Sequence, residues 1–459
     1  MSALITLSIL AIVVLYLGLF KAKKALLPVT LVGLAAVLGL AVREWNSNAS
    51  PIYSDMMLFD NFAVAFTAIC VFSTMLILLI SKDYFERISE HVAEYYAIIL
   101  FALAGIIVMV SYHNLSMLFI GIEIMSVSLY ILAGIRKKSF SSNEAALKYF
   151  LMGAFSTGFL LFGITLLYGA TGSFDIEVIK NYVISNPTHI SPLFYSGLLL
   201  LIVGLCFKVG VAPFHFWAPD VYEGSPSLIS VFMMTVVKTA GFAAFLRIFL
   251  FCFAPLHDFW MMPLLVITIM TLFIGNISAL YQHSFKRMLA FSSVSHAGYM
   301  LFAIVALGSG SINAVILYAT AYSVASIIAF AVLILVKRQM GSDSYESFNG
   351  LGRKNPFMAF ALTVAMLSLA GIPLTAGFIG KFMMLSSALS EYHVSLVVLA
   401  VINAVIGIFY YLRVVVSMYF KDSDQHAVQS TPIFSFVLGF SAIVTIVLGV
   451  YPGLISNLF

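Results

Sequence analysis

Ionisable side chains stand inside several stretches of this sequence that are otherwise apolar. Lys208 and His215 occur in the stretch FKVGVAPFHFWAPD, which continues the apolar run SGLLLLIVGLC. Glu123, Lys238 and Lys381 also lie within runs of mostly aliphatic and aromatic residues. A charge at the middle of a bilayer costs about 2.5–3.5 kcal/mol, so charges that are retained there indicate a role beyond folding.

Proton transfer is the chemistry that these residue types favour. A buried ammonium group gives up its proton more readily than an exposed one, and a nearby carboxylate opposes that loss. Lys208 would therefore be a switchable proton site if Glu123 is a partner that approaches and retreats. His215 follows Lys208 by two helical turns and titrates near neutral pH, which suits it to relay protons to Lys238 on the next helix.

Structural interpretations of the same residues remain open. Glu123 and Lys208 could simply pin two helices together, and His215, between two phenylalanines, could be a packing residue. Lys148 lies one helical turn after Glu144, so an ion pair at the membrane interface is nearly as well supported as a functional role. Lys381 is harder to explain structurally, because its predicted helix carries no acidic residue before Glu391.

The remaining charged and aromatic residues favour structural roles. Arg247 and Arg413 lie near the ends of their predicted helices, where we expect them to reach the interface or to form ion pairs. The 41 Phe and 22 Tyr residues are interpreted as lipid-facing and packing residues.

The composition predicts an all-α, polytopic membrane protein. Of the 459 residues, 62% are hydrophobic and 9% charged, whereas soluble domains carry about 25% charged residues. A spanning helix needs about 20 apolar residues. About fourteen such segments are predicted: 2–20, 25–43, 60–81, 93–110, 114–135, 144–169, 192–219, 226–252, 259–280, 286–306, 313–338, 356–390, 393–419 and 432–455.

The distribution of basic residues predicts the orientation in the membrane. Most of the 23 Lys and Arg residues follow odd-numbered segments, whereas Arg43 and Lys180 follow even-numbered ones. By the positive-inside rule, the odd connections face the cytoplasm and both termini lie outside. The residues after odd-numbered segments are Lys21, Lys23, Lys24, Lys82, Arg87, Arg136, Lys137, Lys138, Lys286, Arg287, Lys337, Arg338, Arg353, Lys354 and Lys421.

Other features exclude several classes of protein. The net charge of +4 follows from this topology, so we expect no nucleic-acid partner. The first segment has KAKK after its apolar run, the reverse of a cleavable signal peptide, and is expected to be retained. The three cysteines are scattered, which favours neither disulfides nor a metal site.

Two predicted helices are interrupted, which is typical of ion sites in transporters. The seventh is broken by Pro213 and Pro219. The twelfth is broken by GIP at 371–373, followed by Gly377 and Gly380. The breaks lie five helices apart, so an inverted repeat is predicted. The predicted domains are residues 1–92, a first five-helix repeat at 93–252, a second at 253–419 and a last helix at 420–459.

Three segments resemble the signature segments of the proton-translocating, antiporter-like subunits of respiratory complex I. They are FKVGVAPFHFWAPDVYEGSP, KRMLAFSSVSHAGYM and LSLAGIPLTAGFIGKF, and the resemblance extends over essentially the whole chain. One departure is Phe291, where many relatives have tyrosine. The N-type branch of this family fits best. M-type subunits typically carry glutamate in place of Lys381, and L-type subunits continue past the point where this chain stops at Phe459.

The resemblance implies a role for each candidate residue. Glu123 corresponds to the glutamate of helix five and Lys208 to its partner on helix seven. Lys238 corresponds to the central lysine of helix eight, and Lys381 to the lysine of helix twelve toward the exit side. Connecting positions, of lesser weight, are implied for Lys148, His215 and His296. The implied fold is two inverted five-helix bundles with flanking helices and discontinuous helices seven and twelve.

The same resemblance implies the setting of the chain. It would be a non-redox subunit of a bacterial NADH:quinone oxidoreductase in the cytoplasmic membrane, moving protons as quinone is reduced elsewhere in the complex. Its neighbours would be an M-type antiporter-like subunit and the small K- and J-type subunits. Flavin, iron–sulfur clusters and quinone are expected in other subunits, and no cofactor or metal in this one.

Two other readings remain open. An Mrp-type cation/proton antiporter subunit shares much of the sequence pattern, including the lysine on helix twelve. A membrane-arm scaffold, in which the charges only hold helices together, is the third reading.

Overall fold

The chain is helical throughout the part that the structure describes. The structure is a computed structural model that describes residues 1–47, 50–86, 88, 91–187, 189–308, 310–391, 394–422 and 428–456. In these ranges the only extended pairing is a set of isolated β-bridges, which confirms the predicted all-α class. Arg87, Phe459 and the start of the thirteenth predicted segment at 393 lie outside the described residues.

Apolar helices of membrane-spanning length account for the predicted segments. Within the described ranges, 13 helices are long and apolar enough to cross a membrane. The predicted segment 356–390 instead forms two shorter apolar helices, α17 (Pro356–Ala370) and α18 (Ala376–Glu391). The chain is therefore a multi-pass membrane protein.

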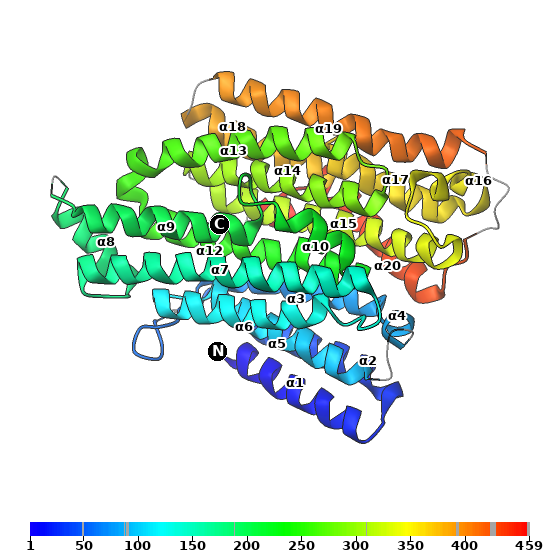
Figure 1. Ribbon diagram of the computed structural model, residues 1–459, viewed down its shortest axis with the longest axis horizontal. Helices are drawn as coiled ribbons and strands as arrows, with labels where there is room; N and C mark the ends of the chain where they lie inside the picture. Colours follow the sequence, from blue (N-terminus) through cyan, green and yellow to red (C-terminus); the bar gives the residue numbers. More distant parts are fainter. Residues whose placement is uncertain are drawn as a thin grey trace. The chain divides into compact units, whose positions relative to one another are not determined.

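The chain divides into two compact units, which are described separately. Unit 1 comprises Met1–Val209, Gly224–Ile229 and Val236–Met262. Its helices (Figure 1) are α1 (Ser2–Leu19), α2 (Lys23–Arg43), α3 (Asn61–Leu79), α4 (Lys82–Glu86), α5 (Val92–Val110), α6 (Leu115–Ala133), α7 (Phe140–Thr171), α8 (Ile176–Ser185), α9 (Pro192–Val209), α12 (Lys238–Phe251) and the short η2 (Ala254–Leu256).

Unit 2 comprises Gly210–Glu223, Ser230–Thr235 and Pro263–Phe459. The helix α11 (Ser227–Phe232) and the π-helical turn η1 (Met233–Val237) are divided between the units, as is α13 (His257–Leu280). The other helices of unit 2 are α10 (Trp217–Gly224), α14 (Phe285–Ala306), α15 (Ser311–Met340), η3 (Tyr345–Phe348), α16 (Leu351–Lys354), α17, α18, α19 (Val394–Phe420), α20 (Pro432–Val450) and α21 (Gly453–Ser456).

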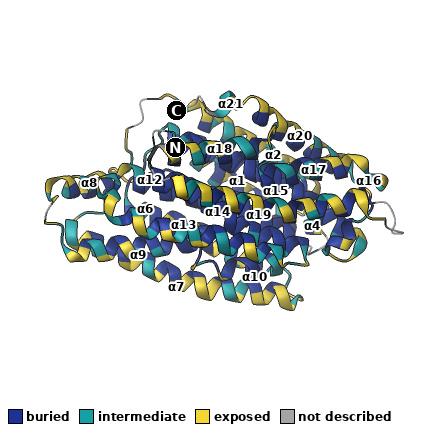
Figure 2. Cartoon of the chain, turned by 90° about the horizontal axis from the view of Figure 1, so that it is seen from above, coloured by how far each residue is buried: buried dark blue, intermediate teal, exposed yellow. Residues whose placement is uncertain are grey.

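Small residues allow close helix packing in unit 1. Helix α7 packs along α9, and a Cβ atom added at Gly163 would lie 2.8 Å from the carbonyl oxygen of Gly197. Close backbone approach at small residues is the usual way in which membrane helices associate. Other residues of α7, among them Phe155 and Phe162, are exposed, as expected of a surface that faces lipid, and Figure 2 shows exposed positions along this helix.

Helix α15 forms the core of unit 2. Nearly all of its residues from Ser311 to Val336 are buried, and it packs against α14, α17, α18 and α20. Because a helix in the interior of a bundle needs apolar residues on every side, α15 has no polar face that sequence periodicity could reveal.

The interruption of the seventh predicted helix is confirmed, but one of its expected causes is wrong. Helix α9 ends at Val209, and Gly210 adopts a positive φ of 69°. The chain then runs without helix through Pro213 and resumes at Trp217. Pro219 does not interrupt the chain. It is the third residue of α10, where even a backbone N–H group would find no acceptor within the helix, so the N–H that proline lacks is not missed.

The interruption of the twelfth predicted helix is also confirmed and is shorter than expected. Gly371 ends α17 with a φ of 84°, and Leu374 has a φ of 71°. Gly377 and Gly380 lie inside α18 and do not extend the break. They serve packing, because a Cβ atom at Gly377 would lie 1.9 Å from the carbonyl oxygen of Ser368. The four-part domain division and the inverted repeat stay predictions.

Candidate functional site

Lys208 forms a polar contact with helix α6 in unit 1. It is the last residue but one of α9, directly before the break. Its ammonium nitrogen donates a hydrogen bond to the Ser126 hydroxyl over 2.9 Å, and that hydroxyl donates to the carbonyl oxygen of Ile122 over 2.6 Å. A residue at the end of an interrupted helix thus carries an amine that donates to a side-chain hydroxyl of α6.

Glu123 lies close to this amine without touching it. Its charge acts on Lys208, but among the described residues the two form no ion pair within 4.0 Å. The Glu123 Oε1 atom is buried and has no hydrogen-bond partner in the described part of the chain. A buried carboxylate oxygen without a partner is costly. The predicted partnership is therefore an electrostatic one in this structure.

The break after α9 carries His215 within unit 2. The backbone that the break frees is partly satisfied by α13, because the Ala212 amide donates to the Thr271 hydroxyl over 3.0 Å. His215 is 5% exposed and stacks beside Phe216, with 4.8 Å between ring centroids. Its Nδ1 atom is buried without a hydrogen-bond partner among the described residues. An imidazole with an unused nitrogen at a helix break can accept a proton.

Lys238 is buried in unit 1 beside a second kind of helix irregularity. It is 2% exposed and begins α12 directly after the π-helical turn η1. Single π-turns inside helices occur frequently at functional sites, because they shift side chains and leave carbonyl groups less tightly paired. The sequence predicted Lys238 as a buried charge and gave no sign of the π-turn.

Lys381 bridges the break between α17 and α18 in unit 2. Its ammonium nitrogen donates hydrogen bonds to the carbonyl oxygens of Leu369 and Ala370, over 2.9 and 3.0 Å. These carbonyls belong to the last turn of α17, where no amide of the same helix can reach them and where the helix dipole favours a positive charge. The same nitrogen lies 4.9 Å from the centre of the Tyr299 ring.

His296 lies in a cluster of buried tyrosines, also in unit 2. Its Nδ1 atom is 2.5 Å from the Tyr318 hydroxyl and its Nε2 atom is 2.9 Å from the Tyr411 hydroxyl. Ser292, one turn earlier on α14, exchanges a hydrogen bond with the Tyr411 hydroxyl. The interpretation of all tyrosines as lipid-facing or packing residues is wrong for this cluster, since these hydroxyls form a polar network inside the bundle.

Two other charges form ion pairs of the kind that was expected, and a third contacts an aromatic ring. Lys148 forms an ion pair with Glu144 over 2.8 Å, and both side chains are about half exposed. Arg247 forms a 2.5 Å ion pair with Asp60. Arg413 lies over the Tyr345 ring, with its guanidinium carbon 4.3 Å from the ring centre. Helix α7 begins at Phe140, earlier than predicted, so Lys148 lies two turns inside it.

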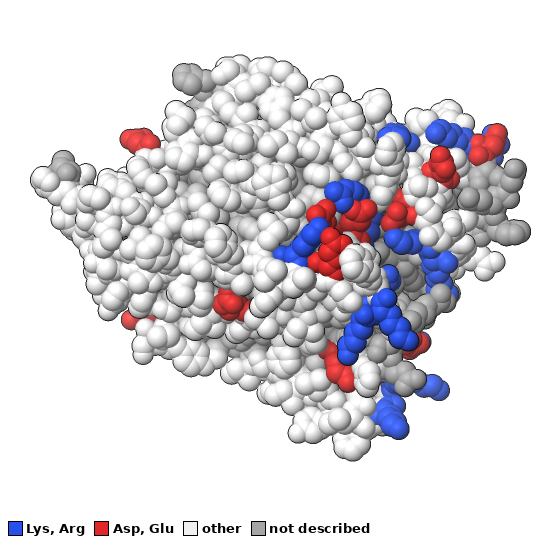
Figure 3. Space-filling model, viewed as in Figure 1, with Lys and Arg blue, Asp and Glu red and all other residues white. Residues whose placement is uncertain are grey.

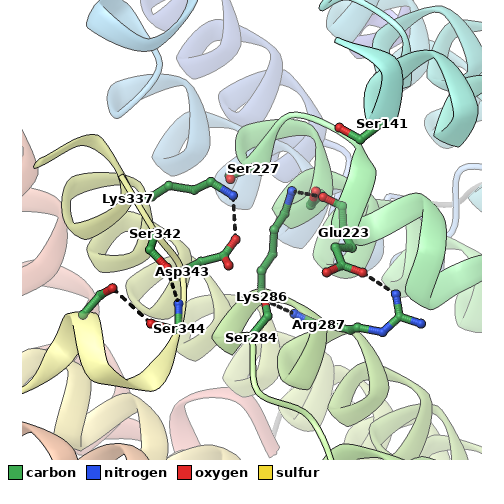
Figure 4. Close-up of polar contacts among 12 residues, drawn as sticks. Ser141, Glu223, Ser227, Ser284, Lys286, Arg287, Lys337, Ser342, Asp343 and Ser344 are labelled. Carbon is green, nitrogen blue, oxygen red and sulfur yellow. Dashed lines mark hydrogen bonds and ion pairs between the residues drawn. The ribbon is translucent and has the colours of Figure 1, made fainter. Parts of the chain in front are cut away.

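A group of charged side chains surrounds the start of α14 in unit 2 (Figure 4). Arg287 forms ion pairs with Asp220 and Glu223, while Lys286 donates to the Glu223 carbonyl oxygen over 2.8 Å. Lys286 was assigned to a connection from the sequence, yet it is 2% exposed. Most of the surface in Figure 3 is neither acidic nor basic, and the acidic and basic side chains on it occur in a few groups.

The same group includes an ion pair between the last turn of α15 and the loop that follows it. Lys337 donates to the Asp343 carboxylate over 2.5 Å. Burial alone would raise the pKa of Asp343, but the hydrogen bond and charge of Lys337, with the charge of Lys286, outweigh it and lower that pKa below its usual value.

The predicted site residues thus fall into two groups. Glu123, Lys208 and Lys238 belong to unit 1, whereas His215, His296 and Lys381 belong to unit 2. Transfer from Lys208 through His215 to Lys238 stays a prediction. In the described part of the chain, no three His, Cys, Asp or Glu side chains are grouped so that they could hold a metal ion.

Known proteins are similar to this chain over most of its length. The profile of the family described as NADH:quinone oxidoreductase/Mrp antiporter, TM, matches residues 112–407. The NADH-quinone oxidoreductase subunit N of Flavobacterium psychrophilum is 39% identical over 100% of both chains.

Two solved structures are also similar. A chain of respiratory complex I from Thermus thermophilus is 32% identical, with a TM-score of 0.85 over 99% of this chain and 98% of that one. A chain of the Mrp complex from Dietzia shares the fold, with 18% identity and a TM-score of 0.89 over 100% of this chain and 95% of that one. The chain therefore belongs to the NADH:quinone oxidoreductase/Mrp antiporter family of membrane subunits, and within it to the subunit N branch.

Proposed function

We propose that this chain is the antiporter-like subunit N of a bacterial NADH:quinone oxidoreductase and that it conducts protons through its membrane-embedded lysines. The proposal rests chiefly on the position of these lysines. Lys208 precedes one helix break, Lys381 follows another, and Lys238 adjoins a π-turn. Irregular backbone inside a membrane is tolerated where it is buried in protein or lines a water-filled cavity.

The proposed mechanism begins at Glu123 and Lys208. Reduction of quinone elsewhere in the complex would change the distance between the Glu123 carboxylate and Lys208, and thereby the proton affinity of the amine. The proton would move through His215 and water to Lys238 and then to Lys381, and a proton from the cytoplasm would replace it. The contact of Lys208 with the Ser126 hydroxyl supports this role, because a hydroxyl can accept a hydrogen bond from the charged amine or donate one to the neutral amine.

We further propose the assembly and orientation that such a role requires. The chain would lie in the cytoplasmic membrane with both termini outside, beside an M-type antiporter-like subunit and the small K- and J-type subunits. Flavin, iron–sulfur clusters and quinone would be held by other subunits, and this subunit would be the non-redox part of the enzyme.

Native electrophoresis with a stain for NADH oxidation is the first test. A tagged chain should migrate with NADH-oxidising activity in a very large assembly. Migration in a smaller particle without that activity would refute the assignment to this complex. Sodium/proton exchange in vesicles would then be measured, since the fold shared with the Dietzia Mrp chain makes a cation/proton antiporter subunit the second candidate.

Lys208→Met tests the mechanism in the assembled complex. Methionine keeps the apolar stem of the side chain and removes the ammonium group. We expect less proton translocation per NADH oxidised, measured by the quenching of a pH-sensitive dye in inverted membrane vesicles. Lys24→Met, at an exposed residue in the first turn of α2, is the matched control. Normal translocation by a fully assembled Lys208→Met complex would remove Lys208 from the path.

A further inference from the structure

We propose that Tyr318 and Tyr411 are proton-relay residues that act in series with His296, one at each nitrogen of its imidazole. The inference rests on the proposed function and adds two tyrosines that sequence analysis did not select. Each hydroxyl contacts one nitrogen of the imidazole, Tyr318 at Nδ1 over 2.5 Å and Tyr411 at Nε2 over 2.9 Å.

Three helices of unit 2 build this arrangement. His296 is on α14, Tyr318 on α15 and Tyr411 on α19. The imidazole is 2% exposed, and both tyrosines are 1% exposed. The rings are held by their helices, so the hydroxyl groups meet the imidazole from opposite sides without any loop that could move away.

The chemical type of the two partners is the central point. A histidine that only braces a fold commonly donates one N–H to a backbone carbonyl, which fixes its tautomer. A carbonyl can only accept, whereas a tyrosine hydroxyl can both donate and accept. With a hydroxyl at each nitrogen, both tautomers of His296 find a donor on one side and an acceptor on the other.

Ser292 extends the chain by one more hydroxyl. It exchanges a hydrogen bond with the Tyr411 hydroxyl, so four groups from Tyr318 to Ser292 are connected in series. Tyr299, on the same helix as His296, lacks this reversibility. The Tyr299 hydroxyl donates to the carbonyl oxygen of Ala400 over 3.2 Å, and a carbonyl cannot reverse that bond.

The transfer of one proton along this chain balances. At the start Tyr318 donates to Nδ1, the Nε2 proton is donated to Tyr411, and Tyr411 donates to Ser292. A proton that binds the Tyr318 oxygen displaces the tyrosine proton to Nδ1. The Nε2 proton then moves to Tyr411, the Tyr411 proton moves to Ser292, and Ser292 releases its own proton to the next acceptor. One proton enters, one leaves, and the imidazole has changed tautomer.

The test uses the assembled complex with Tyr318→Phe, Tyr411→Phe and the double variant. Phenylalanine keeps the buried ring and removes only the hydroxyl. Tyr96→Phe is the matched control, because Tyr96 is equally buried and its hydroxyl is bonded to the Ser81 hydroxyl over 2.6 Å, on a helix, α5, that carries none of the candidate residues. Protons translocated per NADH are measured at equal content of the complex on native gels.

The inference predicts that the losses of proton yield in the two single variants are not additive. Each single variant should lower the proton yield, and the double variant should lower it no further, because groups that act in series fail together. Unchanged yields, or losses that add as independent packing defects do, would overturn the inference. The inference would also be overturned if Tyr96→Phe lowered the proton yield as much as the single variants do.

Serine variants keep the inference testable if a phenylalanine variant does not assemble. Ser292→Ala should lower the proton yield, and Ser292→Thr, which keeps the hydroxyl, should restore it; equal yields in both would overturn the inference. Lys208→Met distinguishes a failure of the tyrosine relay from a failure of the proposed lysine path. If it lowers the yield while the tyrosine and serine variants do not, only the relay is wrong. If it has no effect, the proposed lysine path fails first.

Discussion

Asp60→Asn should destabilise the chain more than Arg247→Met, although both remove the same ion pair. The Arg247 Nη2 atom lies 2.5 Å from the Asp60 Oδ1 atom, a separation at which two unit charges attract by about 6–7 kcal/mol at an effective dielectric constant of about 20. The two ends differ in exposure, since the Arg247 side chain is 2% exposed and that of Asp60 is 28% exposed.

Asparagine at position 60 would leave the buried guanidinium without its counter-charge. Such a loss costs about 3–5 kcal/mol. The Asp60 side chain also accepts from the Ala63 amide at the start of α3, and asparagine can still do so, so the cap is preserved. Methionine at position 247 removes the buried charge itself. The remaining aspartate can be hydrated, and the cost falls to about 1–2 kcal/mol for the lost attraction and aromatic contacts.

Thermal unfolding of the purified, fluorescently tagged protein measures the difference. Loss of the monodisperse peak in size-exclusion chromatography after heating gives a melting temperature for each variant. Asp258→Asn, at an exposed acid in the first turn of α13, is the control and should melt as the unmodified chain does. A melting temperature of Arg247→Met below that of Asp60→Asn would refute the argument that burial of the guanidinium determines the cost.

Two further predictions concern packing and pH. Gly163→Leu should force α7 away from α9, cost about 1–3 kcal/mol or more of stability and lower the melting temperature. Gly158→Leu should not lower it, because a Cβ atom there would meet nothing within 4 Å. Equal effects of the two variants would contradict close packing at Gly163. Asp343→Asn should lower stability at pH 7 by up to about 1 kcal/mol, since its partner Lys337 is partly exposed. The pKa of Asp343 is lowered in the folded chain, so its contribution is present above the unfolded value of about 3.9 and is lost as pH falls through the folded one. The melting temperatures of variant and unmodified chain should converge as pH falls through the lowered pKa of folded Asp343, and a gap that persists once this carboxyl group is protonated would refute the assignment.

The sequence carried enough information for the helices and for the two interruptions. Hydropathy locates spanning segments because lipid demands about 20 apolar residues in a row, and the GIP segment at 371–373 marks a break that the structure has. The roles of Pro219, Gly377 and Gly380 were not predictable in the same way. Proline in a first turn and glycine at a helix contact leave the helix intact, and only the position of the neighbouring backbone reveals which role applies.

The tyrosine network was harder to predict because it joins three helices that are distant in sequence. A signal did exist within α14 and α15. Ser292, His296 and Tyr299 recur at a helical spacing, as do Tyr318 and Tyr322, so each set lies along one side of its helix. Tyr411 on α19 is not part of such a pattern of helically spaced residues that the sequence analysis could have used. The partners of a buried hydroxyl depend on tertiary packing, which a single sequence does not specify.

The contact of Lys381 with the end of α17 also restricts how this segment can vary. Its ammonium group takes the place of the amides that a continuing helix would have supplied to the Leu369 and Ala370 carbonyls. A homologue that replaces the lysine must therefore provide another donor at the same point, or close the gap at 371–375 and restore an unbroken helix. Residue 381 and the length of that gap should accordingly change together in evolution.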